Sequence, residues 1–323
     1  MQDIVPNICS GKDKISNSGK VVLYGSTGVI GKTDFASYKK NIVLVARVGA
    51  NAGQLQIGNA PCGVTDNTLV IDAKEWNYYI YYFLQHYNLN RLVFGSGQPL
   101  ITGGMLKKIK VGHGNKVERI KITRLLCLLD KRIATQNKII ERYESLIRGI
   151  AQKIARNNKP NVLLAECLKC SSSTLQESDV CENGTYPVYG ANGIVGYLDG
   201  YSTEDEAVHI IKDGSGVGTV SYVTGKCSAT GTLNTLQAKD GYLLQYLYYM
   251  LKVFNFEPYK TGMAIPHIYF KDYGKAKIFC PSYTEQLKYV DLLSAIDNKL
   301  SVEQRILTNL SLQKQYLLRL MFI

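Results

Sequence analysis

The stretch Glu118-Arg-Ile-Lys-Ile-Thr-Arg-Leu-Leu-Cys-Leu-Leu-Asp-Lys-Arg-Ile133 opens a long segment whose apolar side chains recur at alternating steps of four and three. The seam positions are Ile122, Leu126, Leu129, Ile133, Gln136, Ile140, Tyr143, Ile147, Ile150 and Ile154. Such steps average about 3.5 residues, the period that keeps one side of an α-helix against a partner helix over many turns. The segment is therefore predicted to form a coiled-coil helix.

The C-terminal segment repeats this spacing, and every seam position is displaced from its counterpart by the same offset of 167 (289 − 122 = 167). The second seam consists of Tyr289, Leu293, Ile296, Leu300, Glu303, Leu307, Leu310, Lys314, Leu317 and Met321. Gln136 and Glu303 interrupt the two seams at the same place, and a polar seam residue can fix the register of a helix pair. The residues expected to pair the two helices are Ile122, Leu126, Leu129, Ile133, Leu293, Ile296, Leu300 and Leu307. The alternative is two unrelated surface helices packed on separate cores.

Comparison of the chain with itself shows a second repeat outside the helices. Tyr24-Gly-Ser-Thr-Gly-Val-Ile-Gly31 matches Tyr189-Gly-Ala-Asn-Gly-Ile-Val-Gly196 at an offset of 165 (189 − 24 = 165). The same offset relates further pairs: Arg47–Gly53 with Lys212–Gly218, Cys62 with Cys227, Thr65 with Thr230, Tyr81 with Tyr246, and Gly97 with Gly262. The chain is therefore predicted to be a tandem duplication of a globular part followed by a long helix.

Each globular part is predicted to mix α and β structure. Short apolar runs bounded by glycine-rich turns, at 42–45 and 208–211, indicate strands. The segments 77–87 and 241–253 are rich in tyrosine and leucine and have the length of a helix. The predicted fold class is α+β, with domains at 1–117 and 158–283, each followed by a helix at 118–157 and 284–323.

Composition favours a soluble protein with a polyanionic partner. The chain has 323 residues, of which 46% are hydrophobic and 20% charged, and its formal net charge is +12. No segment approaches the run of about 18 uncharged apolar residues that suggests a membrane span. The start Met-Gln-Asp-Ile-Val-Pro lacks the features of a signal peptide, so we expect a cytoplasmic protein without membrane contact. The positive charge favours nucleic acid as a partner.

No metal site, catalytic site or cofactor is predicted. The eight cysteines include one close pair, Cys167 and Cys170, without a second pair at zinc-finger distance. Gly31-Lys-Thr33 lacks the first glycine of a phosphate-binding loop, because position 26 is serine. An amine methyltransferase is expected to carry two adjacent prolines, and many restriction-type nucleases carry a proline followed by aspartate. Neither pattern occurs in this chain. A binding protein is therefore favoured over an enzyme.

Polar side chains in the repeated loops suit DNA binding, because arginine, asparagine and glutamine can form paired hydrogen bonds with base edges. Their identities differ between the copies while the glycine frame persists. The expected DNA-reading residues are Ser26, Thr27, Arg47, Asn51 and Gln54 in the first copy, and Asn192, Lys212, Ser215 and Thr219 in the second. A basic cluster suits phosphate contact and consists of Lys107, Lys108, Lys110, Lys116, Arg119, Lys121 and Arg124. The alternative is that these loops are merely solvated.

The alternation of globular part and long helix, with Tyr189–Gly196, Lys212–Gly218 and Leu287–Leu300, resembles the specificity subunits of type I restriction-modification systems. In that family each globular part is a target recognition domain for one half of a bipartite DNA site. The resemblance implies an antiparallel coiled-coil pair that separates two target recognition domains. It also implies assembly with methyltransferase subunits that bind S-adenosylmethionine, and with a restriction and translocase subunit. The first copy departs from the family pattern at 97–101.

We therefore expect a non-catalytic subunit that binds double-stranded DNA and directs its partners to a target. Two other classes stay open: a duplicated coiled-coil scaffold that binds proteins, and a stand-alone DNA-modifying enzyme. Methylation or cleavage of DNA by the chain alone would favour the enzyme, and a lack of salt-dependent DNA binding would favour the scaffold.

Overall fold

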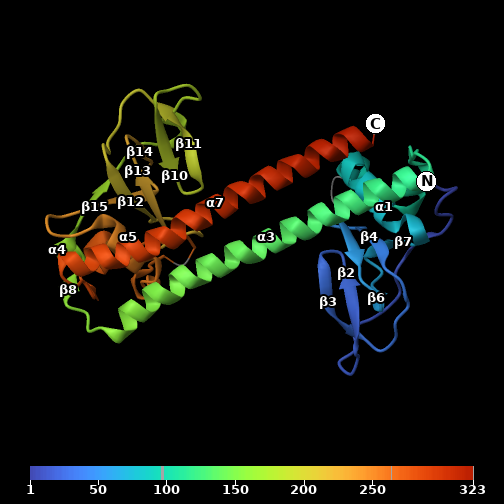
Figure 1. The fold of residues 1–323 in the computed structure, drawn as a ribbon, viewed down its shortest axis with the longest axis horizontal. Coiled ribbons are helices and arrows are strands. Elements are labelled where there is room, and N and C mark those ends of the chain that lie inside the picture. Colours follow the sequence, from blue (N-terminus) through green and yellow to red (C-terminus); the bar gives the residue numbers. More distant parts are fainter. Residues whose placement is uncertain (96–97, 263, 323) are drawn as a thin grey trace. The chain divides into compact units, whose positions relative to one another are not determined.

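The computed structural model describes residues 1–95, 98–262 and 264–322. Its contacts divide the chain into two compact units: unit 1 is Met1–Asn137 with Arg305–Ile323, and unit 2 is Lys138–Gln304. Helices α3 (Lys116–Asn157) and α7 (Tyr283–Met321) each contribute one part to unit 1 and the other part to unit 2 (Figure 1). None of the described helices is long and apolar enough to cross a membrane.

Unit 1 contains two sheets that share an apolar core. The larger has the strand order β1-β7-β4-β5 and the smaller the order β3-β2-β6. The strands are β1 (Ile8–Ser10), β2 (Val21–Gly25), β3 (Gly28–Thr33), β4 (Ile42–Ala46), β5 (Leu55–Gly58), β6 (Cys62–Val64) and β7 (Thr68–Ile71). The helices are η1 (Lys74–Trp76), α1 (Asn77–Tyr87), η2 (Leu89–Leu92) and α2 (Gly103–Lys108).

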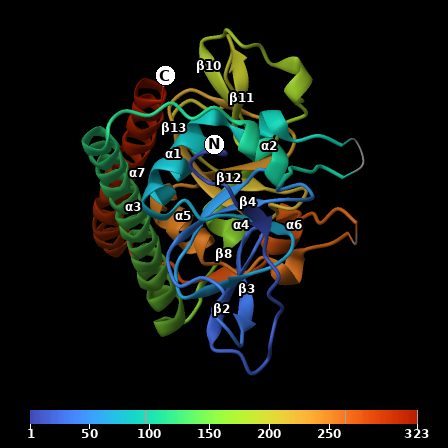
Figure 2. The ribbon, with the colours of Figure 1, turned by 90° about the vertical axis from the view of Figure 1, so that its right-hand side faces the viewer.

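Strand β4 lies between two layers, which explains its uninterrupted apolar sequence. Val43 and Val45 share a core with α1, whereas Ile42 and Leu44 share a second core with β2 and β6. Because both faces of the strand are covered, its residues are apolar at every position and do not alternate. Figure 2 shows, as does Figure 1, α1 on one side of β4 and the β2–β3 hairpin on the other.

Unit 2 repeats this arrangement, with sheet orders β13-β12-β15-β9 and β11-β10-β14 and an added pair β16-β8. Its strands are β8 (Val162–Leu163), β9 (Leu168–Ser172), β10 (Tyr186–Gly190), β11 (Gly193–Leu198), β12 (Glu206–Ile211), β13 (Val220–Thr224), β14 (Ser228–Ala229), β15 (Leu233–Ala238) and β16 (Lys277–Ile278). Its helices are α4 (Leu164–Cys167), η3 (Glu177–Asp179), α5 (Leu244–Lys252), η4 (Glu257–Tyr259) and α6 (Phe270–Tyr273). The register shifts after Leu23 in β2 and after Val188 in β10, again at the offset of 165 (188 − 23 = 165). The predicted duplication of a mixed α and β domain is confirmed.

The predicted correspondence of Tyr81 with Tyr246 is wrong. Tyr79 Oη donates to Gly112 O and Tyr246 Oη donates to Phe279 O, each over 2.9 Å. Tyr246 therefore corresponds to Tyr79, at an offset of 167, and not to Tyr81. The offset changes earlier than predicted, because the second copy has two extra residues between its last core strand and the helix after it.

The long helices pack antiparallel inside unit 1. Ile122 lines the same cavity as Met321, and Asp130, two turns further along α3, forms an ion pair with Lys314, two turns back along α7. Among the predicted pairing residues, Leu126, Leu129, Leu293 and Leu300 are buried and Ile122, Ile133, Ile296 and Leu307 are half-buried. The helices begin at Lys116 and Tyr283, within two residues of the predicted starts. The seam residue Gln136 is also buried.

Candidate nucleic-acid interface

Four segments of unit 1 meet beyond the ends of β2 and β4: the hairpin tip 25–28, the loop 47–54, the turn 65–67 and the segment 98–101. The carbonyl of Asn67 accepts hydrogen bonds from Ser26 Oγ at 3.0 Å and from Arg47 N at 2.9 Å. Gly49 N donates to Pro99 O over 2.9 Å. We call these four segments reading surface 1.

The equivalent segments of unit 2 are the hairpin tip 190–193, the loop 212–219, the turn 230–232 and the segment 264–268, and the same main-chain bonds join the last three, whereas Ala191 has no hydroxyl to repeat the bond of Ser26. Lys212 N donates to Thr232 O over 3.0 Å, and Gly214 N donates to Pro266 O over 2.9 Å. We call them reading surface 2. The backbone frame is thus built twice, while its side chains differ.

Glycines fix the turns of both frames. Gly49 and Gly214 adopt φ of 80° and 91°, where a side chain would be strained. Bridges between Phe94 and Leu100, and between Thr261 and His267, close the last segment of each surface at an offset of 167. Gly262 therefore corresponds to Gly95, and not to Gly97, which lies outside the described residues. A rigid frame of this kind holds polar side chains in place for a ligand.

All nine predicted DNA-reading residues lie on these two surfaces, and their contact with DNA stays a prediction. Ser26 and Thr27 form the tip of the β2–β3 hairpin, and Asn192 lies at the tip of the β10–β11 hairpin. The loop residues Asn51, Gln54, Ser215 and Thr219 are exposed, whereas Arg47 and Lys212 are half-buried at the start of their loops. Arg47 Nη1 donates to Ser10 Oγ over 3.1 Å, which orients the guanidinium.

Three residues of the basic cluster expected to contact phosphate lie elsewhere in unit 1, and the other four, Lys116, Arg119, Lys121 and Arg124, lie at the start of α3. Lys107, Lys108 and Lys110 line a depression of about 460 Å³ together with Met1–Ile4. Gln2 N donates to Lys107 O over 3.2 Å, so this part of the chain packs beside the N-terminus. Their role in phosphate contact stays a prediction.

Several residues of the reading surfaces were not predicted. The carbonyl of Asn67 joins the hairpin tip to the loop, and Gln56 Nε2 donates to Gly25 O over 2.6 Å. Main-chain acceptors leave no side-chain signature in a sequence. The only available signal was the repeat of Thr65 as Thr230, which marks the turn in both copies.

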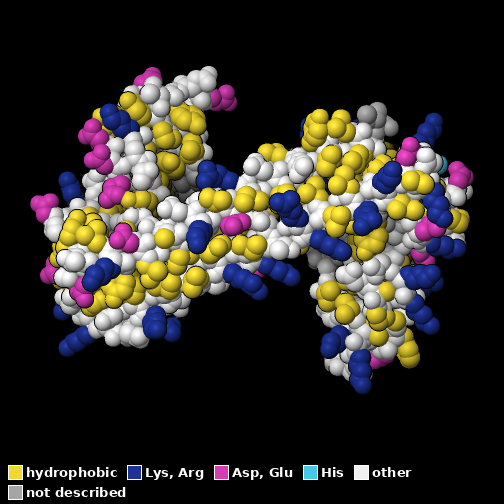
Figure 3. Space-filling view, in the orientation of Figure 1, with side chains coloured by type: hydrophobic (Ala, Val, Ile, Leu, Met, Phe, Trp, Pro, Cys, Tyr) yellow, Lys and Arg dark blue, Asp and Glu magenta, His cyan; other side chains and the backbone are white. Residues whose placement is uncertain are grey.

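Charge is distributed unequally between the copies. Residues 1–115 contain 12 lysines and arginines against 6 acidic residues, a net charge of +6, whereas residues 158–282 contain 10 against 12, a net charge of −2. Helix α3 contains 11 against 4, a net charge of +7. Lysine and arginine side chains are spread along the exposed surface of α3 (Figure 3). The positive charge of the chain therefore lies in the first copy and in α3.

The geometry is that of a duplicated α+β scaffold that presents the same backbone frame twice, and comparison with known proteins places this scaffold in a family. The family described as the type I restriction modification DNA specificity domain matches residues 7–145 and 164–312. These two matches cover most of the chain and coincide with its two copies. The protein belongs to this family.

Two curated proteins are similar over part of the chain. A putative type I restriction enzyme specificity subunit of Haemophilus influenzae, S.HindORF215P, is 30% identical over 123 residues, which are 37% of this chain and 32% of that protein. The specificity subunit of the type I restriction enzyme EcoprrI of Escherichia coli is 28% identical over 116 residues, or 36% of this chain and 29% of that protein. Each match spans about a third of the relative's length.

Solved structures share the fold. The type I restriction-modification S subunit from M. genitalium has a TM-score of 0.70 and 20% identity, with 98% of this chain and 93% of that chain covered. A chain from a study of complex assembly and conformational transition of the type I R-M system has a TM-score of 0.51 and 14% identity, with 98% and 95% covered. The predicted fold class, two duplicated mixed domains with two long helices, is confirmed.

Proposed function

We propose that this protein is the DNA-reading subunit of a type I restriction-modification system, with each reading surface contacting one half of a bipartite site. The observation that carries the proposal is the backbone frame of reading surface 1, rebuilt in unit 2 with different side chains. A duplicated scaffold with two different sets of polar side chains fits a target with two different halves. A scaffold for binding proteins would not need hydrogen-bonding side chains that differ in this way.

The proposed partners are double-stranded DNA, methyltransferase subunits that bind S-adenosylmethionine, and a restriction and translocase subunit. The chain itself would be non-catalytic, would need no cofactor, and would work in the cytoplasm. Family membership supports a targeting role. Among the described residues, no group of three or more histidine, cysteine, aspartate or glutamate side chains is placed to hold a metal ion.

Affinity for duplex DNA is expected to fall steeply with salt. Each phosphate neutralised by lysine or arginine contributes about −0.9 to the slope of log K against log salt, because condensed counterions are released. Titration of the complex at several salt concentrations measures this slope. In a variant with Lys107, Lys108 and Lys110 changed to glutamine, the slope of log K against log salt should be shallower by ~0.9 for each lysine that contacts phosphate. A flat response of the unaltered protein would contradict the DNA proposal.

Arg47→Ala is expected to relax recognition at one half-site only. A base contact of this kind is worth roughly 1 to 3 kcal/mol of discrimination, and Arg47 belongs to reading surface 1 alone. Competition binding with DNA altered in either half-site measures the effect, and Lys212→Ala is the matched variant for the other surface. Equal loss at both halves would show that Arg47 contacts phosphate or supports the fold.

A further inference from the structure

Unit 1 contains a triad of one tyrosine, one aspartate and one lysine where its two long helices meet α1. Tyr82 Oη donates to Asp130 Oδ2 over 2.8 Å, and Lys314 Nζ lies 2.6 Å from Asp130 Oδ1. Lys314 Nζ also lies 5.6 Å from the centre of the Tyr82 ring. The Lys314 and Asp130 side chains are only 18% and 32% exposed, so the ion pair is largely shielded from water.

Unit 2 repeats two members of this triad and lacks the third. At the helix offset of 167, Tyr82 corresponds to Tyr249 and Asp130 to Asp297, and Tyr249 Oη donates to Asp297 Oδ2 over 3.3 Å. The position of Lys314 is taken by Ile147 (314 − 167 = 147). Among the residues that the structure describes, no lysine or arginine forms an ion pair with Asp297.

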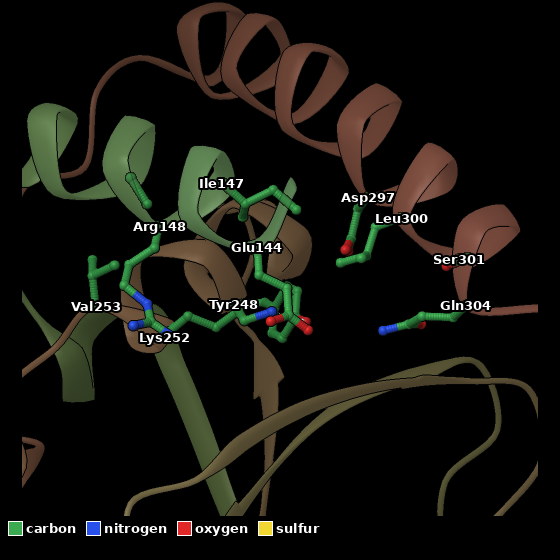
Figure 4. A pocket seen from close by; sticks show the side chains of 11 residues that line it. Glu144, Ile147, Arg148, Tyr248, Lys252, Val253, Asp297, Leu300, Ser301 and Gln304 are labelled. Atoms are coloured by element: carbon green, nitrogen blue, oxygen red, sulfur yellow. The ribbon is translucent and has the colours of Figure 1, made fainter. Parts of the chain in front are cut away.

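A cavity of about 440 Å³ lies where the cation is missing (Figure 4). Ile147 and Asp297 both line it, from α3 and α7 respectively. Its apolar wall includes Ile147, Ala151 and Leu300, which are 2%, 1% and 6% exposed. Ala151 corresponds to the larger Leu318 of unit 1, so the second copy has lost volume as well as charge.

Within the described part of the chain, the two basic residues that line the edge of the cavity, Arg148 and Lys252, do not form an ion pair with Asp297. Lys252 Nζ donates to Tyr248 Oη over 3.0 Å and is held over the ring of the same tyrosine. Arg148 is an exposed residue of α3 whose guanidinium points away from Asp297 in Figure 4. The half-buried carboxylate of Asp297 therefore keeps a site for a cation that its own unit does not supply.

We propose that this cavity receives a lysine or arginine side chain of a methyltransferase subunit, whose cation completes the triad with Asp297 and Tyr249. Unit 1 shows the kind of side chain that would bind, because there the equivalent residues, Asp130 and Tyr82, contact a lysine, Lys314. The apolar wall suits the aliphatic stem of such a side chain, and the carboxylate suits its charged end. This inference rests on the proposed function, since it needs a methyltransferase partner.

The test measures assembly of the full chain with the methyltransferase subunit of its own system. Asp297→Asn removes the charge and keeps the shape, and it should weaken binding ~30-fold or more, as for one partner of a buried interfacial charge pair. Ile147→Lys supplies an internal lysine as in unit 1, and it should weaken binding similarly by filling the cavity. Isothermal titration gives the affinity, and thermal melting shows whether each variant is folded.

Two controls separate this inference from its alternatives. Ile147→Leu keeps the cavity apolar and should leave the affinity within about threefold of the original. Asp130→Asn breaks the internal ion pair of unit 1 and should lower the melting temperature without changing the affinity. If the unaltered chain does not assemble, the proposed function fails. If it assembles, and Asp297→Asn is folded and binds equally well, the inference is overturned. An increase in melting temperature with spermidine that requires Asp297 would assign the cavity to a free polyamine, and would also overturn it.

Discussion

Insertion of four residues after Asn137 and four after Gln304 should lengthen the spacer between the two half-sites by one or two base pairs, with both half-site sequences unchanged. These positions are where the contacts of the structure pass from one unit to the other in each helix, and they are related by the helix offset of 167 (305 − 138 = 167). Both helices would then grow by the same amount at equivalent places.

Helix geometry gives the size of the change. Four residues add about 6 Å to an α-helix and rotate the rest of the helix by about 40°. One base pair of B-DNA adds about 3.4 Å and, at 10 to 10.5 base pairs per turn, about 35° of rotation. The added rotation of the helix matches that of one base pair, and its added length approaches the rise of two base pairs. Because four is close to the seam period, the apolar stripe stays nearly continuous.

Mapping of methylated sites in the reconstituted complex measures the spacer directly. The matched control inserts two residues at the same places, which turns the seam by about 200° and should prevent stable pairing of the helices. A folded four-residue variant that still modifies DNA at the original spacer would show that the helices do not set the distance. A change in the recognised half-site sequences would also contradict the prediction that the helices set only the spacer.

The sequence predicted the long helices well because their seam is a purely local pattern. A step of three and four residues, repeated over ten positions and again in the C-terminal segment at a constant offset, has few explanations other than two paired helices. The strands β4 and β12 were predicted for a similar reason, since their apolar runs are short and bounded by glycine-rich turns. The order of the strands within each sheet was not predicted, because it depends on pairing between segments that are far apart in the sequence.

The features that the sequence could not predict depend on contacts between distant segments. Asn67 joins three segments through its main-chain carbonyl, which any residue could provide. The second copy has Ile147 where unit 1 has Lys314. This substitution indicates a missing cation only once the structure shows that Ile147 and Asp297 line one cavity. Tyr81 was paired with Tyr246 because the two extra residues of the second copy lie in a loop without a distinctive sequence.

His209 is another difference between the copies, and it has a consequence for stability. It lies in β12 at the position of Leu44 in β4 (209 − 165 = 44), and the two side chains are 1% and 0% exposed. Neither ring nitrogen of His209 has a hydrogen-bond partner among the described residues. In unit 1, Leu44 belongs to one continuous core with Tyr24 and Ile42, whereas the equivalent core of unit 2 is divided into two small clusters.

His209→Leu should therefore stabilise unit 2 by about 1 to 3 kcal/mol at neutral pH, because a buried polar group without a hydrogen bond costs about this much. An apolar side chain of similar size removes that cost. Hydrogen exchange of the amides of β12 measures the gain as slower exchange. Exchange in β4 of unit 1 serves as the internal reference, and Leu44→His should produce the opposite change there.

The advantage of the leucine variant should grow as the solution becomes acidic. Burial lowers the pKa of His209 to about 4 from the ordinary value of 6.5. Below pH 6.5 the unfolded chain binds a proton that the folded chain does not accept until about pH 4. Stability from this group is therefore complete above pH 6.5 and falls by about 3 kcal/mol as the pH decreases to 4. Denaturation of both proteins from pH 7.5 to 4.5 should show a weaker pH dependence for His209→Leu, and equal slopes would mean that His209 is not held neutral in the fold.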